Sequence, residues 1–462
     1  MYDFKKIVLG YAPTRRLDFP PPQLAYQNSL AIKERVYPIL EKLGDVEIVD
    51  LSLINNEGLL YNIEDAEKAA EMFKEKKVDA LFVPHANFGC EEAVVTLCRR
   101  LRVPVLIWGP RDEAPPGGYC YRQTDTQCGL FATTTDLLRE KIPFSYIENC
   151  WLEDPLLDQK IEDFIRTVSA VKAFNNLRIG QIGPRPRDFL CLKSDESALV
   201  NRFGIEVIPI DGTEYVAEFN RVLSEEKDKV EALIEETATF FPNGSISAKR
   251  AEEIAAIEIS IQNLAKRFQC SVIASDCWYI NPLLHGAHPC FAFGNLMEKG
   301  LPVACETDVY GAVTEALVMG AARGETACFF ADLTVRHPEN DNAELLWHCG
   351  PFPKSLAKQS CSPDLMDDCM GRYEIRGGDV TVARFGGIDG DFSLFCGEGK
   401  GVEGPVTGGT YMWMQVSDWP RWERKLMYGP YPHHVCGVHG KYKAALQEAC
   451  RYLSLRFVDP ER

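Results

Sequence analysis

The sequence predicts an α/β protein with two units of alternating strands and helices, followed by a C-terminal region of antiparallel strands. Short apolar runs alternate with segments of helical periodicity up to about residue 174, and the same alternation starts again near residue 177. From about Gly350 the chain becomes rich in glycine, and short alternating runs such as VTVARF indicate strands and turns. Because 462 residues exceed one ordinary domain, we expect domains at residues 1–174, 175–349 and 350–462.

The N-terminal domain is expected to hold a parallel sheet with helices on both faces. Predicted strands alternate with predicted helices along this part of the chain, and such alternation is typical of parallel sheets. The predicted strands are Lys6–Ala12, Val46–Leu51, 80–85 and Val103–Gly109, and the predicted helices are Leu24–Leu43, Ile63–Lys76 and 87–101.

The central domain repeats this pattern after a helical stretch at Pro155–Phe174. Strands are predicted at residues 178–183, 203–211 and 271–276, and an apolar run at Leu301–Cys305 resembles a further strand. Ser247 is predicted to cap a long helix whose apolar residues keep the helical period. Further helices are expected over Ala312–Ala322 and, in the C-terminal domain, over Lys441–Leu455.

Charge and composition exclude several classes of protein. The net charge of −17 argues against non-specific binding to nucleic acid or to an anionic membrane surface. No apolar run approaches the roughly 18 residues that a membrane span needs, and the N-terminus lacks a signal-peptide layout, so we expect a cytoplasmic protein. The 17 cysteines contain no CxxC pair, which favours scattered thiols over disulfides or a zinc ribbon.

Acidic residues follow two apolar runs, and histidines cluster near the C-terminus. Glu306 and Asp308 lie in CETDVYG, directly after Leu301–Cys305, and a second apolar run ends on Asp332. Residues two apart in a strand point to one face, and ligands bind at strand ends in open α/β sheets. With the histidines of YPHHVCGVHG, these acids suit a manganese or magnesium ion. The alternatives are solvated carboxylates at strand ends, or a metal held by His285 and His288.

Several segments together resemble the L-fucose isomerase and L-arabinose isomerase superfamily. They are CETDVYGAVTEAL, FFADL and PHH, in that order, with VLGYAPTRRLDF and PHANFGCEEA nearer the N-terminus. The resemblance runs from about residue 5 to about residue 455. It implies two Rossmann-like domains followed by an antiparallel β-barrel-like domain. It also implies an aldose–ketose isomerase that uses Mn²⁺, or another divalent cation such as Mg²⁺ or Co²⁺, and that assembles as a homo-oligomer, commonly a hexamer.

The resemblance also implies roles for individual residues. The metal ligands correspond to Glu306, Asp332 and His434, and the two acids would also transfer protons. Arg16 corresponds to an arginine stretch that reaches an active site, in the same subunit or a neighbouring one. His433 adjoins His434, and the sequence does not decide which of them binds the metal. His348 is a further candidate, because arabinose isomerases use an additional histidine after the second acid.

Other polar and aromatic residues could contact a sugar. Asn87 and His85 lie at the end of a predicted strand, where they would bind hydroxyl groups or only cap a loop. Trp278 and Tyr279 could stack on a sugar face, although such aromatics are more often part of a core. We take Arg16, Asn87, Trp278 and His433 as the candidate substrate-binding residues.

The predicted site suits isomerisation of an aldose through an ene-diol. That reaction needs a carboxylate base near carbon, a second proton-transfer group, and a cation for the developing oxyanion. A hydride shift, an epimerase or lyase reaction, and sugar binding without chemistry remain alternatives. The substrate would be fucose-like, arabinose-like or a sulfonated sugar, for which Arg15, Arg16, Arg185 and Arg187 are candidate anion-binding residues.

Overall fold

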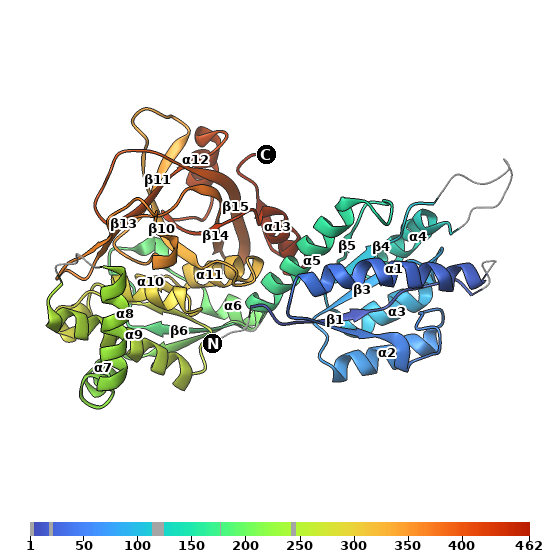
Figure 1. The fold of residues 1–462 in the computed structure, drawn as a ribbon, viewed down its shortest axis with the longest axis horizontal. Coiled ribbons are helices and arrows are strands. Elements are labelled where there is room, and N and C mark those ends of the chain that lie inside the picture. Colours follow the sequence, from blue (N-terminus) through green and yellow to red (C-terminus); the bar gives the residue numbers. More distant parts are fainter. Residues whose placement is uncertain (1–3, 18–21, 113–123, 176, 242–245) are drawn as a thin grey trace. The chain divides into compact units, whose positions relative to one another are not determined.

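The computed structural model describes residues 4–17, 22–112, 124–175, 177–241 and 246–462. The chain divides into two compact units, residues 5–172 and residues 173–462, the second of which also includes Phe4 (Figure 1). No helix among the described residues is both long and apolar enough to span a membrane.

The N-terminal unit is a five-stranded parallel sheet with helices on both faces. The strand order is β2-β1-β3-β4-β5, and every pairing between neighbours is parallel. Helix α1 lies on one face of the sheet, and α2 and α3 lie on the other (Figure 1). Strands β1 and β3 are buried at every residue, because both faces are covered. The elements are β1 Ile7–Tyr11, α1 Pro22–Lys42, β2 Val46–Asp50, α2 Ile63–Glu75, β3 Ala80–Pro84, α3 Glu91–Leu101, β4 Val105–Trp108, α4 Thr126–Arg139, β5 Ser145–Tyr146 and α5 Pro155–Phe174.

The second unit begins with a four-stranded parallel sheet in the order β7-β6-β8-β9. Its strands are β6 Arg178–Ile182, β7 Glu206–Ile210, β8 Val272–Ser275 and β9 Val303–Cys305. Its helices are α6 Glu196–Phe203, α7 Gly212–Glu225, α8 Lys227–Phe240, α9 Ala248–Arg267, α10 Cys290–Glu298 and α11 Val309–Ala321. Ser247 caps α9 by accepting from the Arg250 N–H, as the sequence predicts.

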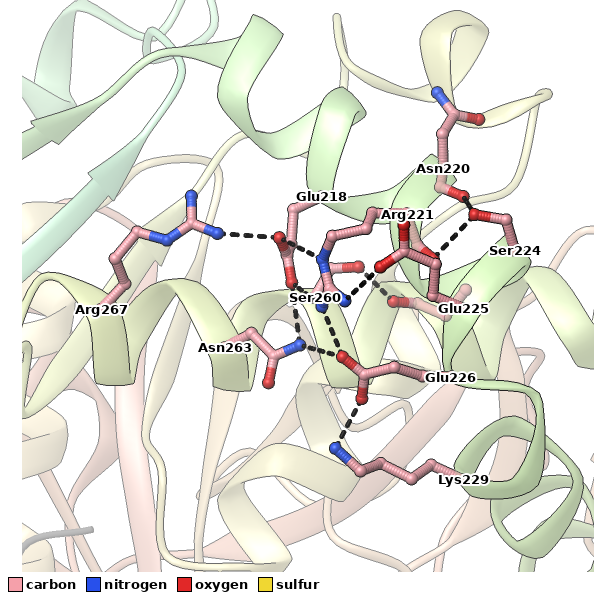
Figure 2. A network of polar contacts seen from close by, with 11 residues as sticks. Glu218, Asn220, Arg221, Ser224, Glu225, Glu226, Lys229, Ser260, Asn263 and Arg267 are labelled. Atoms are coloured by element: carbon pink, nitrogen blue, oxygen red, sulfur yellow. Dashed lines mark hydrogen bonds and ion pairs between the residues drawn. The ribbon is translucent and has the colours of Figure 1, made fainter.

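Helices α7 and α9 are joined by a polar network around the buried Glu218 (Figure 2). The Glu218 carboxylate accepts from Arg221 on α7 at 2.6 Å, from Asn263 on α9 at 2.8 Å, and from Arg267 on α9 at 2.9 Å. Hydrogen bonds from Arg221 outweigh burial and hold the pKa of Glu218 at about 2. The buried charge is therefore fully paired.

The second unit also contains a β-barrel of six antiparallel strands. The strands follow the order β16-β11-β10-β17-β14-β15, and β15 closes the ring by pairing with β16. The barrel strands are β10 Cys328–Arg336, β11 Ala343–His348, β14 Gly378–Ile388, β15 Asp391–Val402, β16 Thr410–Gln415 and β17 His434–His439. The remaining elements of this unit are β12 Asp364–Leu365, β13 Gly371–Glu374, α12 Trp419–Met427, α13 Lys443–Tyr452, β18 Arg456–Val458, and the short 3₁₀ helices Leu190–Leu192, Asn281–Leu284 and Lys354–Leu356. A further 3₁₀ helix, Leu51–Leu53, lies in the N-terminal unit.

The architecture confirms the predicted fold class of two parallel α/β sheets and an antiparallel barrel. Strands β10 and β11 belong to the barrel, although they come from the range expected in the central domain. The division into three domains stays a prediction. The short strand β5 and the helix α4 were not predicted; β5 has only two residues, too few for a recognisable apolar pattern.

Helix α11 connects the sheet to the barrel and is buried along its whole length. It lies between the last sheet strand, β9, and the first barrel strand, β10, and it contacts β14 and β17 as well as β9. Its Glu315 is fully buried, and neither carboxylate oxygen has a hydrogen-bond partner among the described residues. Burial, and then the negative charge of Asp308, raise the pKa of Glu315 well above its ordinary value.

Glu315 is expected to make stability depend on pH. The native state keeps this proton at pH values where the unfolded chain has lost it, so the folded state loses stability as pH rises above about 4.3. Glu315→Gln removes the titration. The variant should gain on the parent by up to about 1.4 kcal/mol for each pH unit above that value, until the native pKa is reached. Urea unfolding with a chelator present, at about pH 5 and about pH 8, measures the gain.

Glu231→Gln, on the exposed face of α8, is the matched control and should show no such trend. A Glu315→Gln variant whose stability relative to the parent is the same at both pH values would contradict a protonated Glu315.

Candidate functional site

The register of two barrel strands brings an acid and a histidine together. Strands β10 and β17 are antiparallel, and Asp332 lies directly opposite His434. The His434 Nε2 atom lies 3.5 Å from the Asp332 Oδ1 atom. His348, at the end of β11, and His433 each place Nε2 3.9 Å from the same oxygen. Asp332 therefore has three imidazoles around one carboxylate oxygen.

Glu306 reaches the same histidine from the end of β9. Its Oε2 lies 3.0 Å from His434 Nε2, and its Oε1 accepts from the Trp278 indole N–H at 2.9 Å. Glu306 and Thr307 both have left-handed backbones, with φ of 59° and 56°. Such backbone is strained for these residue types and is concentrated at functional sites. The Thr307 N–H donates to the Ser275 carbonyl at 3.0 Å, which holds this turn against the end of β8.

The other side of the His434 ring contacts Asp308. His434 Nδ1 lies 2.8 Å from Asp308 Oδ2, and Arg384 on β14 donates to both oxygens of that carboxylate. Asp308 also caps α11 by accepting from the Gly311 N–H at 2.9 Å. Asp308, Arg384 and His434 are all buried.

The sequence argument for Glu306 and Asp308 was wrong in its geometry. Alternation along a strand was expected to point both side chains to one face, but β9 ends at Cys305 and the chain turns at Glu306. The two carboxylates consequently contact opposite nitrogens of the same imidazole.

The pKa values in the cluster reflect burial and mutual hydrogen bonds. Burial alone would raise the pKa of Glu306, but the contact with His434 leaves it lowered. Burial would lower the pKa of His434, but the hydrogen bonds with Asp308 and Glu306 leave it raised. Burial would also raise the pKa of Asp308, but the charge of Arg384 and the contact with His434 leave it lowered.

The donor set fits a divalent cation. Two groups of side chains could each hold an ion with ligand atoms within 4.8 Å of one another: Glu306 with His433 and His434, and Asp332 with His348 and His434. Asp332 Oδ1 and His348 Nε2 are buried without a hydrogen-bond partner among the described residues. Buried polar atoms without partners are costly, and a cation would satisfy both. Mixed carboxylate and imidazole donors suit ions such as Mn²⁺.

The rival pair His285 and His288 does not form such a group among the described residues. His285 Nδ1 lies 3.3 Å from Glu253, whereas His288 Nδ1 contacts the Asn281 side chain at 2.7 Å. The two histidines therefore contact different partners.

Arg16 and Asn87 lie in the N-terminal unit, where they contact each other. The Arg16 N–H donates to Asn87 Oδ1 at 2.8 Å. The Arg16 guanidinium pairs with Glu91 and lies 3.7 Å from the centroid of the Phe88 ring. His85 is fully buried, with Nδ1 3.0 Å from the Phe88 carbonyl. Their roles in sugar binding stay predictions.

Aromatic side chains border the cluster in the second unit. The Phe189 ring centroid lies 5.3 Å from that of Trp278 and 5.6 Å from that of His433. Trp278 is 50% exposed, and Tyr279 receives a hydrogen bond from the Arg187 N–H at 2.8 Å. The sequence analysis did not select Phe189, although it lies in the loop after a predicted strand. It also missed Arg384, whose signal is a single cation within the apolar run VTVARF.

Comparisons with known proteins agree with the resemblance. Residues 14–175 match the family model described as "Fucose/sulfoquinovose isomerase, N-terminal domain". A sulfoquinovose isomerase of Priestia megaterium is 24% identical over 443 residues, covering 90% of this chain and 97% of the relative. A sulfoquinovose isomerase of Alkalicoccus urumqiensis is 25% identical over 397 residues, covering 83% and 86%. The chain therefore carries a fucose/sulfoquinovose isomerase N-terminal domain and is a distant homologue of sulfoquinovose isomerases.

Proposed function

We propose that this protein is a metal-dependent aldose–ketose isomerase that acts on a free sugar. The observation that carries the proposal is the convergence of three side chains: Glu306 directly after β9, Asp332 in the middle of β10, and His434 at the start of β17. The family match supports a sugar isomerase. The buried Asp332 Oδ1 atom, which has no hydrogen-bond partner in the part of the chain that the structure describes, supports a cation at this point.

Glu306, Asp332 and the Nε2 atom of His434 would hold the ion. Mn²⁺, or another divalent cation such as Mg²⁺ or Co²⁺, would supply Lewis-acid stabilisation of negative charge on the sugar oxygens. The two carboxylates repel each other when both are ionised, and positive charge between them removes that cost.

The proton transfers are assigned to the same two carboxylates. One takes the proton from C2 of the open-chain aldose while O1 gains a proton, which gives an ene-diol. A proton is then returned to C1 while O2 loses its proton, which gives the ketose. The Trp278 indole holds one Glu306 oxygen, so the carboxylate is oriented before the sugar arrives. Trp278 and the partly exposed His433 are proposed to contact the sugar.

A sulfonated sugar is the substrate that the surrounding charges favour. Arg185 and Arg187 line a pocket of about 590 Å³ with Tyr279, next in sequence to Trp278. Arg185 donates only to backbone carbonyls, and no ion pair is formed by either arginine among the described residues. Guanidinium groups without carboxylate partners suit a sulfonate. The relatives are themselves named sulfoquinovose isomerases. Neutral fucose-like or arabinose-like sugars are the second candidates.

Three further expectations stay predictions. Arg16 and Asn87 are proposed to bind sugar hydroxyl groups. The protein is proposed to assemble as a homo-oligomer, and it is proposed to act in the cytoplasm.

The first test is the reaction itself. With Mn²⁺ present, ketose should form from at least one aldose of a panel containing L-fucose, L-arabinose and sulfoquinovose, with the highest kcat/KM for the sulfonated sugar. In deuterated water, NMR should find deuterium at C1 of the ketose, because the proton returned there comes from an exchanging carboxyl group. A product without deuterium would favour a hydride shift. Sugar binding that is unchanged by a chelator, with no product formed, would favour a non-catalytic binding protein. An epimer as product would favour an epimerase, and a cleaved product would favour a lyase.

Ligand substitutions test the metal site. Glu306→Gln, Asp332→Asn and His434→Ala should each lower bound metal at least about tenfold and abolish turnover. The first two remove the negative charge that offsets the cation with little change of shape, and the third removes a nitrogen ligand that only His433 could replace. His433→Ala should lower the amount of bound metal less, since His433 is partly exposed at the edge of the cluster. Metal analysis after dialysis measures the difference. The matched control His288→Ala should bind metal like the parent, and full metal content in His434→Ala would refute this assignment.

Metal affinity should rise with pH. The pKa of His434 is raised in the metal-free protein, and an imidazole must lose its proton before it can bind a metal. Binding therefore releases about one proton below that pKa, and the apparent affinity for Mn²⁺ should increase by up to about tenfold per pH unit there. Calorimetry in buffers of different ionisation enthalpy counts the protons. An affinity that is flat from about pH 6 upward would contradict His434 as the ligand.

A further inference from the structure

We propose that Asp308 and Arg384 are positioning residues that fix which nitrogen of His434 faces Glu306 and Asp332. This inference rests on the proposed function, because it assigns the support of a proposed metal ligand. Neither residue would touch the ion or the sugar. Asp308 acts through the imidazole, and Arg384 acts through Asp308.

The hydrogen-bond directions follow from the chemistry of the three side chains. Arg384 can only donate, and it donates to both Asp308 oxygens, to Oδ1 at 2.9 Å and to Oδ2 at 2.5 Å. The Gly311 N–H donates to Oδ1 at 2.9 Å. An Asp308 carboxylate held by three donors is ionised and can only accept. The contact with His434 Nδ1, at 2.8 Å, therefore requires the proton to lie on Nδ1.

A proton on Nδ1 leaves the Nε2 lone pair free in the neutral imidazole. Nε2 is the nitrogen that lies near Glu306 Oε2 and Asp332 Oδ1, at 3.0 and 3.5 Å. In the other tautomer, Nε2 would carry a proton and donate it to Glu306, so neither group would be available to a cation. Metal-binding histidines commonly have a carboxylate on the second nitrogen for this reason.

The support comes from rigid parts of the fold. Asp308 is the N-cap of the buried helix α11, Arg384 lies on β14, and His434 begins β17. Strands β14 and β17 are hydrogen-bonded neighbours, with Ala383 opposite Cys436. The Thr314 hydroxyl on α11 accepts from the Phe385 N–H at 2.9 Å, so β14 is also tied to the helix that Asp308 caps.

The ion pair between Arg384 and Asp308 is almost completely buried. Arg384 and Asp308 are each 1% exposed, and Arg384 Nε has no partner among the described residues. Burying a pair of charges costs free energy that apolar side chains of similar volume would avoid. Positioning His434 would explain why the protein keeps a buried ion pair at this place despite its cost in free energy.

Asp308→Asn tests the positioning of His434 with little change in the shape of the side chain. The amide oxygen can still accept from Gly311, while the amide N–H₂ faces Nδ1 and favours the proton on Nε2. Two-bond ¹⁵N–¹H NMR of histidine-labelled, metal-free protein, at a pH where the ring is neutral, should show the Nδ1–H tautomer in the parent and the Nε2–H tautomer in the variant. Calorimetry should show Mn²⁺ binding weakened by about 10- to 100-fold.

The arginine variants separate positioning from folding. Arg384→Met should weaken Mn²⁺ binding. Arg384→Lys keeps the positive charge but cannot donate to both Asp308 oxygens, so its Mn²⁺ affinity should lie between that of Arg384→Met and that of the parent. The matched control is Arg372→Met, which breaks an ion pair with Asp368 elsewhere in the unit and should leave tautomer and affinity unchanged. If Arg384→Met fails to fold, Asp308→Asn and Arg384→Lys still decide the question.

A folded Asp308→Asn variant with the parent's tautomer and the parent's Mn²⁺ affinity would overturn the proposal. So would an affinity loss in Arg372→Met equal to that in Arg384→Met, because the effect would then be general destabilisation. The His434 tautomer is measured without metal or sugar. A reversed tautomer in Asp308→Asn would therefore support the positioning role of Asp308 even if no aldose were turned over. Failure of the proposed function would appear separately, as full metal content in His434→Ala.

Discussion

The candidate site depends on one imidazole that is contacted from both sides. His434 meets Glu306 through Nε2 and Asp308 through Nδ1, and it has no exposed surface. The two acids come from the turn between the last strand of the parallel sheet and α11, whereas His434 comes from the barrel. Because a buried polar side chain must find its partners, these contacts fix the sheet edge against the barrel. The same contacts also decide where a cation could bind.

Much of the fold could be read from local patterns. The central parallel strands β1, β3, β4 and β8 are buried apolar runs, and Ser247 is a cap of the expected type. The C-terminal antiparallel strands were predicted from about residue 350, but the barrel already begins with β10 at Cys328. Strands β10 and β11 follow a helix and precede a change in composition, so their sequence gives no sign that they pair with strands many residues later.

The candidate site was predicted unevenly for a similar reason. Glu306, Asp332 and His434 lie in recognisable segments, and the structure brings them together. Asp332 was expected at a strand end, but β10 continues to Arg336 and places it in the middle of the strand. Arg384 could not be assigned, because its contact with Asp308 spans 76 residues and exists only once β14 lies beside β17 and α11. The alternation rule failed at Glu306 because the backbone leaves the strand there. Long-range pairing and local backbone reversal are the two properties that a sequence pattern does not carry.

The position of β17 in the barrel also limits the order in which the chain can mature. This strand lies between β10 and β14 in the sheet, although it follows both of them in the sequence. During synthesis the ring stays open until residues 434–439 have left the ribosome, long after Glu306 and Asp332. The strand that supplies His434 is thus also the strand that completes the barrel, and a nascent chain carries an unpaired sheet edge until β17 is in place.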